Sequence, residues 1–142
     1  MQVAIHCDGG SRGNPGPAAS AFTAQAGGKK IKEQKEFIGV STNNVAEYKS
    51  LLMALTWLLE FLQKESKVHS AKIFMDSQLV VRQVTGEYKV KSGNIIPLIA
   101  QVKEMEREIK KRVNIDISHV TRGENSRADS LVNEAIDEAL AG

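Results

Sequence analysis

The first forty residues contain three strand-like segments with little more than turn residues between them. In residues 2–8 apolar and polar side chains alternate, which predicts a strand that ends at Asp8. A second strand is expected at 19–25 and a third at 31–40, and Gly27 with the glycine after it marks a hairpin turn between them. Strands joined by short turns pair antiparallel. The chain is therefore expected to begin as a three-stranded antiparallel unit.

After residue 40 helices alternate with strands. The expected elements are a helix from Thr42 or Asn43 to about 63, a strand at 71–75, a short helix capped by Ser77 and ending before Gly86, a helix with Pro97 in its first turn that runs to about 111, a strand at 113–117, and a helix from Asn125 or Ser126 to 142. The order βββαβααβα predicts an α/β fold, with a mixed five-stranded sheet and helices on its faces. No repeat or linker divides this pattern, so residues 1–142 are expected to form a single domain.

Composition narrows the class of protein. Hydrophobic residues make up 42% of the 142 residues and charged residues 25%, as in ordinary globular proteins. The longest apolar stretch, 51–62, is interrupted by Thr56 and Glu60 and is too short to span a bilayer, and no signal-peptide pattern opens the chain. The single cysteine, Cys7, fits a reducing compartment, so a cytoplasmic location away from membranes is expected. Trp57 is expected in the core. The formal net charge of +2 permits nucleic-acid binding without requiring it.

Four acidic residues lie at the end of an apolar run or near an expected helix start: Asp8, Glu47, Asp76 and Asp129. Asp8 and Asp76 end predicted strands, and they approach each other if those strands are neighbours. Glu47 and Asp129 are expected in first helical turns, where the helix dipole keeps a carboxylate ionised. Two carboxylates about 4 Å apart repel by roughly 4 kcal/mol at an effective dielectric of about 20, and divalent cations relieve that repulsion. Singly, each residue could be a cap or turn residue. Together they have the composition of a two-metal phosphoryl-transfer centre.

The motifs around these residues resemble type 1 ribonuclease H, in the same order and at similar spacing along essentially the whole chain. They are Asp8 to Pro17, Thr42-Asn43-Asn44-x-x-Glu47, Asp76-Ser77-Gln78 and Asn125-x-x-Ala128-Asp129. The resemblance implies an endonuclease that cleaves the RNA strand of RNA/DNA hybrids and leaves 5′-phosphate and 3′-hydroxyl ends. It also implies two Mg²⁺ ions, with Mn²⁺ as a possible substitute, bound by the four carboxylates. A monomer without an obligate protein partner is expected.

Neutral polar residues beside the acidic motifs are candidates for contacting nucleic acid: Asn14, Asn43, Asn44 and Gln78. Such groups suit the ribose 2′-OH, which distinguishes RNA from DNA, and the resemblance implies that the matching positions contact the RNA strand. Taken alone, the asparagines could instead serve as turn and cap residues. The resemblance also implies that Thr42 helps to hold a DNA phosphate, although this chain has Val40 where some relatives carry an arginine. Gly9 opens a glycine-rich loop to Pro17, where glycine permits close approach to a bound group.

Two features depart from the family pattern. Residues 83–97 are too short for the basic helix-and-loop handle that many bacterial relatives insert there. The loop at 121–124 lacks the mobile histidine that many ribonucleases H carry before the last helix. Arg122 in this loop is assigned to neutralising phosphate charge, because an arginine stays protonated and cannot act as a general base. His119 is in register with the preceding strand and is expected to be a strand residue with its ring nitrogens bonded locally.

Two other functions remain open. A DNA-directed nuclease of the same fold, such as a resolvase or integrase core, shares the carboxylates but would not be expected to carry the set Asn14, Asn43 and Gln78. An inert hybrid-binding module would normally have lost at least one carboxylate, and none is missing.

Overall fold

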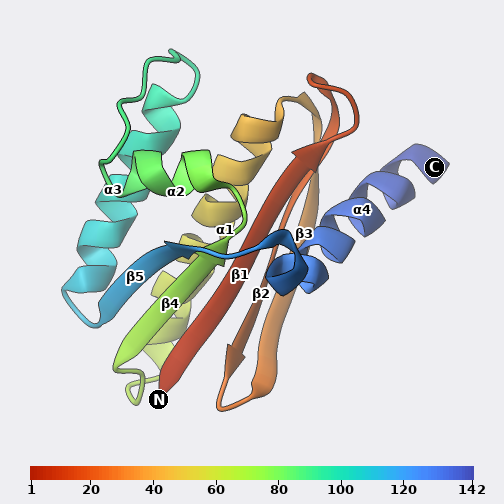
Figure 1. Ribbon diagram of the computed structural model, residues 1–142. Helices are drawn as coiled ribbons and strands as arrows, with labels where there is room; N and C mark the ends of the chain where they lie inside the picture. The colour runs from red at the N-terminus through yellow and green to blue at the C-terminus, as the bar shows by residue number, and fades with distance from the viewer.

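The elements occur in the expected order. In the computed structural model, which describes residues 1–142, they are β1 (Gln2–Ser11), β2 (Gly16–Ala26), β3 (Lys29–Ser41), α1 (Asn43–Lys64), β4 (Ser70–Met75), α2 (Gln78–Val84), α3 (Ile96–Lys110), β5 (Asn114–His119), the 3₁₀ turn η1 (Arg122–Asn125) and α4 (Ser126–Ala141). The strands form one sheet in the order β3-β2-β1-β4-β5 (Figure 1). β2 is antiparallel to β1 and β3, whereas β4 is parallel to β1 and β5. The predicted mixed five-stranded α/β fold is confirmed.

The two faces of the sheet carry separate cores. Val3, Ile5 and Cys7 of β1 belong to the main cluster of 23 buried residues, to which α1, α2 and α3 also contribute. On the opposite face α4 packs against Ala19 and Ala21 of β2 in a cluster of six buried residues. Figure 1 shows α1, α2 and α3 on one side of the sheet and α4 on the other. Cys7, the single cysteine, is buried in β1.

β1 continues beyond the residue at which its end was expected. Its parallel ladder with β4 stops at Cys7, but its antiparallel ladder with β2 continues through Asp8 to Ser11. The prediction that the strand ends at Asp8 is wrong, because pairing with β2 keeps the two following glycines extended. The connection to β2 is correspondingly short, residues 12–15. Asp8 lies where one neighbouring strand has ended and the other continues, which opens space beside it at the end of β4.

Side-chain caps begin the two helices that follow the acidic motifs. The Thr42 hydroxyl accepts a hydrogen bond from the Val45 amide at 3.2 Å and starts α1, and the Ser77 hydroxyl does the same for α2. Since α1 begins at Asn43, Glu47 is its fifth residue and lies just past the first turn, not in it as expected. The helical spacing places three further α1 residues on one face with Glu47, and all are buried, namely Leu51, Ala54 and Leu58.

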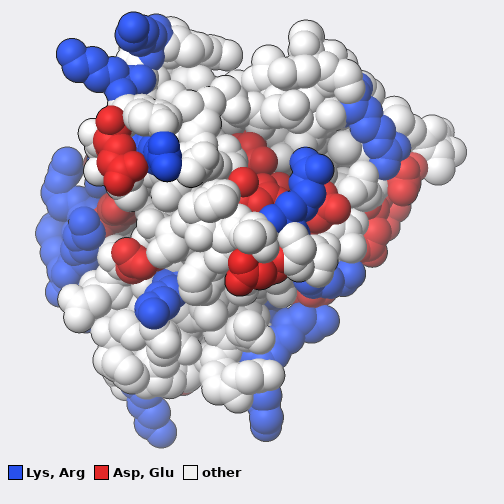
Figure 2. Space-filling model, in the orientation of Figure 1, with Lys and Arg blue, Asp and Glu red and all other residues white.

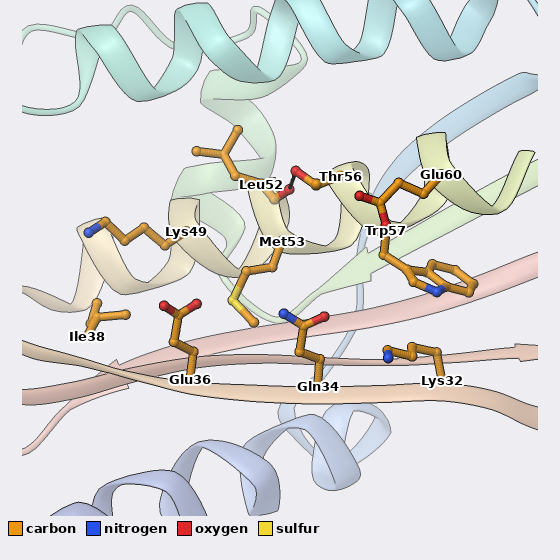
Figure 3. A pocket seen from close by; sticks show the side chains of 10 residues that line it. All are labelled: Lys32, Gln34, Glu36, Ile38, Lys49, Leu52, Met53, Thr56, Trp57 and Glu60. Carbon is orange, nitrogen blue, oxygen red and sulfur yellow. Dashed lines mark hydrogen bonds between the residues drawn. The ribbon is translucent and has the colours of Figure 1, made fainter. Parts of the chain in front are cut away.

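Trp57 lies at the margin of the main core and is only partly buried. Its ring stacks on Phe61 with centroids 4.9 Å apart and contacts Phe22 at 5.8 Å. Trp57 and Met53 of α1 face β3 across a groove of about 420 Å³ (Figure 3). The expectation of a core tryptophan therefore holds for its packing but not for full burial. Lysine and glutamate side chains alternate with neutral ones along this groove, and it lies apart from the acidic motifs.

None of the helices has both the length and the apolar character that a membrane-spanning helix needs.

Candidate active site

Three carboxylates meet at the end of the sheet where β1 runs past the end of β4. Asp8 comes from β1, Glu47 from α1 and Asp76 from the bend after β4, and one oxygen of each lies within 4.8 Å of the others. They line a hollow of about 390 Å³. Figure 2 shows acidic side chains gathered at the centre of the face that Figure 1 presents. The condition under which Asp8 and Asp76 approach each other is met, because β1 and β4 pair in a parallel ladder.

Gly9 allows Glu47 to reach Asp8. A Cβ atom on Gly9 would overlap the backbone of Ala46 and the amide of Glu47, so α1 rests directly on the strand at this point. Ser20 of β2 fixes the same turn, because its hydroxyl donates to the Ala46 carbonyl at 2.7 Å. Gly9 was expected to admit a bound group. It lines the hollow, but the group that its missing side chain admits is the helix itself.

Burial raises the pKa of two of the carboxyl groups, those of Asp8 and Glu47. It raises the pKa of Asp8 from 3.8 to about 8, with further contributions from the charges of Asp76 and Asp129. Burial also raises the pKa of Glu47 well above its ordinary value, and the charge of Asp8 acts in the same direction. Desolvation and like charges thus oppose the helix dipole at Glu47, and the effect of that dipole falls off beyond the first turn.

Asp129 lines the same hollow from α4, in the first turn of that helix as expected. It lies outside the group of three oxygens, yet its charge and its side chain both raise the pKa of Asp8. The start of α4 is tied to β1 by Asn125, whose buried Nδ2 donates to the Cys7 carbonyl at 2.7 Å. One hydrogen bond therefore connects the residue before Asp8 to the turn that carries Asp129.

The donor set fits a hard divalent cation. Each of Asp8, Glu47 and Asp76 offers a carboxylate oxygen, the ligand type that Mg²⁺ and Mn²⁺ prefer. The Oε2 atom of Glu47 is buried and has no hydrogen-bond partner, which is costly unless a ligand or proton satisfies it. Burial, and after it the charges of Asp76 and Asp129, raise the pKa of Asp8, and a bound cation would stabilise its ionised form. These three residues could hold a metal ion.

Asparagines connect the acidic hollow to the start of α1. The Asn43 side-chain oxygen accepts from the Ser11 amide at 2.9 Å, and the Asn14 oxygen accepts from the Asn43 amide at 3.0 Å. These bonds join segments about thirty residues apart and are not local turn or cap bonds, since the cap of α1 is Thr42. Because both oxygens are occupied, the amide NH₂ groups of these exposed residues remain as hydrogen-bond donors. Asn43 and Asn44 line the hollow, whereas Asn14 does not line it and contacts it only through its hydrogen bond with Asn43.

Arg122 lines the hollow, whereas His119 does not. Arg122 is the first residue of η1, a turn fixed by hydrogen bonds between Thr121 and Glu124, with 2.8 Å between the Thr121 hydroxyl and the Glu124 carboxylate. His119 is the last residue of β5, as its register predicted. Its side chain is exposed and its ring makes no hydrogen bond within the protein, so the expected local bonding is wrong. The reason is its position at the strand end, beyond the buried Ile117.

Thr42 and Gln78 are not brought into the lining of the hollow. The Thr42 hydroxyl accepts the capping hydrogen bond of α1, and Gln78 is an exposed residue at the start of α2. Gln78 directly follows the lining residue Ser77, and Thr42 directly precedes the lining residue Asn43.

Other lining residues carried weaker sequence signals. Asn133 lies four residues after Asp129, a spacing that places both on one face of a helix, and its side chain donates to the Asp129 carbonyl at 3.1 Å. Arg12 also lines the hollow and pairs with Asp137 at 2.7 Å. That pair spans 125 positions in sequence and has no local pattern that would predict it.

Comparisons with known proteins agree with this geometry. The family model for RNase H matches residues 1–137. Bifunctional protein Rv2228c of Mycobacterium tuberculosis is 39% identical over 142 residues, covering 98% of this chain and 36% of that protein. Ribonuclease HI of Halobacterium salinarum is 37% identical over 139 residues, covering 97% of this chain and 66% of that protein. The chain thus spans about a third of the length of the mycobacterial relative.

Among solved structures, LC11-RNase H1 in complex with an RNA/DNA hybrid superposes with a TM-score of 0.88 at 42% identity, over 97% of this chain and 99% of that one. The family model covers nearly the whole chain, and the acidic residues of its four motifs line one hollow. The chain therefore belongs to the ribonuclease H family.

Proposed function

We propose that this protein is a metal-dependent endonuclease that hydrolyses the RNA strand of RNA/DNA hybrids and leaves 5′-phosphate and 3′-hydroxyl ends. The observation that carries the proposal is the convergence of Asp8, Glu47 and Asp76, from three separate elements, to within 4.8 Å. Its substrate is supported by the relative LC11-RNase H1, whose structure holds an RNA/DNA hybrid.

In this proposal Asp8, Glu47, Asp76 and Asp129 bind two Mg²⁺ ions, for which Mn²⁺ can substitute. The chemistry supplied by the two ions when bound is Lewis-acid activation of the attacking water and stabilisation of the departing 3′ oxygen. The contribution of the protein is to hold the carboxylates together against their repulsion. The main core does so, because β1, β4 and α1 are joined there by fully buried side chains.

Other residues bind and orient the hybrid. The free amide donors of Asn14 and Asn43, with Asn44 and Gln78, are proposed to contact the RNA strand and its 2′-OH groups. The backbone at Gly9 is proposed to approach the RNA, and Thr42 is proposed to contact a DNA phosphate. Arg122 is proposed to neutralise phosphate charge at the scissile position, since its exposed guanidinium lines the acidic hollow.

Residues 1–142 are proposed to act as one domain and as a monomer, with the hybrid duplex as partner. One continuous sheet runs through the chain, which supports a single domain. The proposed location is the cytoplasm, where a lone buried cysteine stays reduced.

The test is cleavage of end-labelled RNA/DNA, RNA/RNA and DNA/DNA duplexes of one sequence, each with Mg²⁺ and with a chelator. Cleavage of the RNA strand of the hybrid, only with the cation and with 5′-phosphate products, is expected. Preferential cleavage of DNA/DNA would favour the resolvase-like alternative, and tight hybrid binding without cleavage would favour the inert module. Either result would overturn the proposal.

A further inference from the structure

α4, which carries Asp129, packs against a part of the sheet whose buried apolar side chains are small. Its buried residues Leu131, Val132, Ala135 and Ile136 meet only Ala19 and Ala21 on the sheet side of the cluster. Apolar contact fixes a helix precisely when large side chains from both elements interdigitate, and alanine methyl groups offer little to interlock with. Apolar packing therefore holds α4 on the sheet but specifies its exact position only weakly.

Polar contacts supply that specification: the hydrogen bond of Asn125 ties the start of α4 to β1, and charged pairs tie the helix to β3. Arg127 donates from Nε and from one terminal nitrogen to the two carboxylate oxygens of Glu33 on β3, at 2.8 and 2.9 Å. Further along α4, Lys35 of β3 pairs with Glu138 at 2.7 Å. Both pairs join β3 to α4, one near the start of the helix and the other near its end. The Glu33–Arg127 pair lies close to Asp129, whereas the Lys35–Glu138 pair lies far from it.

The Glu33–Arg127 pair differs from an ordinary surface ion pair in two respects. It has the bidentate geometry that fixes both direction and distance, whereas most exposed pairs contribute little. In addition, the Glu33 side chain is only 16% exposed. Arg127 stands two residues before Asp129, in the same turn of α4. A shift of Arg127 relative to β3 would therefore move Asp129 relative to Asp8.

We infer that Glu33 is a positioning residue, which acts through Arg127 to hold Asp129 against the other three carboxylates. The inference rests on the proposed function, in which Asp129 binds a divalent cation. Glu33 does not line the acidic hollow and touches no reacting atom in this account. Its effect is expected on the affinity for the cation and on turnover, and not on the KM for the hybrid.

The decisive variant is Glu33→Gln, which keeps the size of the side chain and removes the charge. The matched control is Glu138→Gln, which makes the same substitution in the pair at the far end of α4 and changes net charge equally. For both, the Mg²⁺ concentration that gives half of the maximal rise in Tm is measured without substrate. The kcat and KM for hybrid cleavage are then measured at low and saturating Mg²⁺.

For Glu33→Gln the half-maximal Mg²⁺ concentration should rise about tenfold, the lower end of the range for residues that orient metal ligands. Turnover should fall at low Mg²⁺ and recover at saturation, with KM unchanged. Glu138→Gln should leave all three quantities near wild type. The double variant Glu33→Gln with Arg127→Gln should add little to Glu33→Gln, because the other pair of Arg127, with Glu134 at 3.3 Å, lies within α4 and does not reach β3.

Equal Mg²⁺ midpoints in Glu33→Gln and wild type, or equal shifts in Glu33→Gln and Glu138→Gln, would overturn the inference. A wild-type protein that fails to cleave the hybrid would overturn the proposed function instead. In that case the Mg²⁺ titration of Tm would still decide whether Glu33 positions a cation ligand.

Discussion

Asp8 has a pKa of about 8 in the folded protein, well above its ordinary 3.8, so the stability of the metal-free protein must depend on pH. A carboxyl with a raised folded-state pKa binds its proton more tightly in the folded than in the unfolded chain. Its unfavourable contribution is absent below about pH 4 and grows as pH rises toward 8. Glu47 shifts in the same direction. Burial lowers the pKa of His6, and this makes the free energy of unfolding rise with pH, opposite to the effect of Asp8. The effect of Asp8 is therefore measured as the difference between wild type and a variant that lacks this carboxyl.

We therefore predict that the free energy of unfolding in a chelator falls from pH 5 to pH 8 more steeply for wild type than for Asp8→Asn. The comparison removes the contribution of His6, which both proteins share. Urea unfolding at several pH values measures it, and saturating Mg²⁺ should reduce the difference because the cation binds the ionised folded protein. If the free energy of unfolding varied with pH in the same way for both proteins, the pKa of Asp8 would not be raised in the folded protein.

Arg122 and His119 offer a second test of single residues. Arg122→Ala should lower turnover by about one to two orders of magnitude, the effect of losing one charge contact to the reacting phosphate. His119→Ala should change both turnover and stability little, since the side chain is exposed and outside the hollow. Single-turnover cleavage and thermal unfolding of both variants are the measurements. The reverse pattern, with an inactive but folded His119→Ala, would make His119 catalytic.

Among whole elements, the junction of β1 with α4 depends on one buried side chain. Asn125→Ala removes the hydrogen bond to the Cys7 carbonyl and leaves that buried oxygen unsatisfied. The free energy of unfolding should fall by about 1–3 kcal/mol, the usual range for an orphaned buried group. Chemical denaturation measures this, with the exposed Asn114→Ala of β5 as control. A loss no larger than that of the control would mean that water replaces the amide without penalty.

The sequence predicted the elements well, and the differences have physical causes. Local alternation located the strands, and the hydroxyls of Thr42 and Ser77 marked helix starts, because these signals act over a few residues. The extension of β1 to Ser11 was missed because glycines resemble a turn until β2 pairs with them. The exposure of His119 was missed because strand register specifies the face on which a side chain lies, but not whether another element covers that face at the end of the strand.

The candidate site was predictable to a different extent. Asp8, Glu47 and Asp76 were identified by their motifs and do converge, and Arg122 does line the same hollow. The raised pKa of Glu47 was not foreseen, because burial is a property of the assembled fold. The Glu33–Arg127 pair joins residues 94 positions apart and has no local signal at all. Contacts of this kind become visible only when the strands and helices are placed.

At the scale of the whole molecule, charge sets how the protein meets a duplex. The formal net charge is only +2, and the hollow itself is acidic. In the face that Figure 2 shows, most Lys and Arg side chains lie toward the margins and few lie beside the acidic centre. Between α2 and α3, the short connection carries two exposed cations, Lys89 and Lys91.

We predict hybrid binding with a Kd on the order of micromolar or weaker and a shallow dependence on salt, since few phosphates are neutralised. A catalytically inactive variant titrated against labelled hybrid at several NaCl concentrations gives the slope. A slope that corresponds to about eight or more released counterions would show that another basic surface binds the duplex.

The proposed function requires that the fold hold mutually repelling carboxylates together so that they bind the cations used to cleave RNA. The most direct measurement follows Asp76→Asn in two ways, by hybrid cleavage with Mg²⁺ and by Tm in a chelator and with Mg²⁺. Because the charge of Asp76 contributes to the raised pKa of Asp8, its removal should leave the metal-free Tm equal to or above that of wild type. Cleavage should be abolished and the rise in Tm on adding Mg²⁺ should be largely lost. Undiminished turnover in Asp76→Asn, with a Mg²⁺ response like that of wild type, would contradict the account.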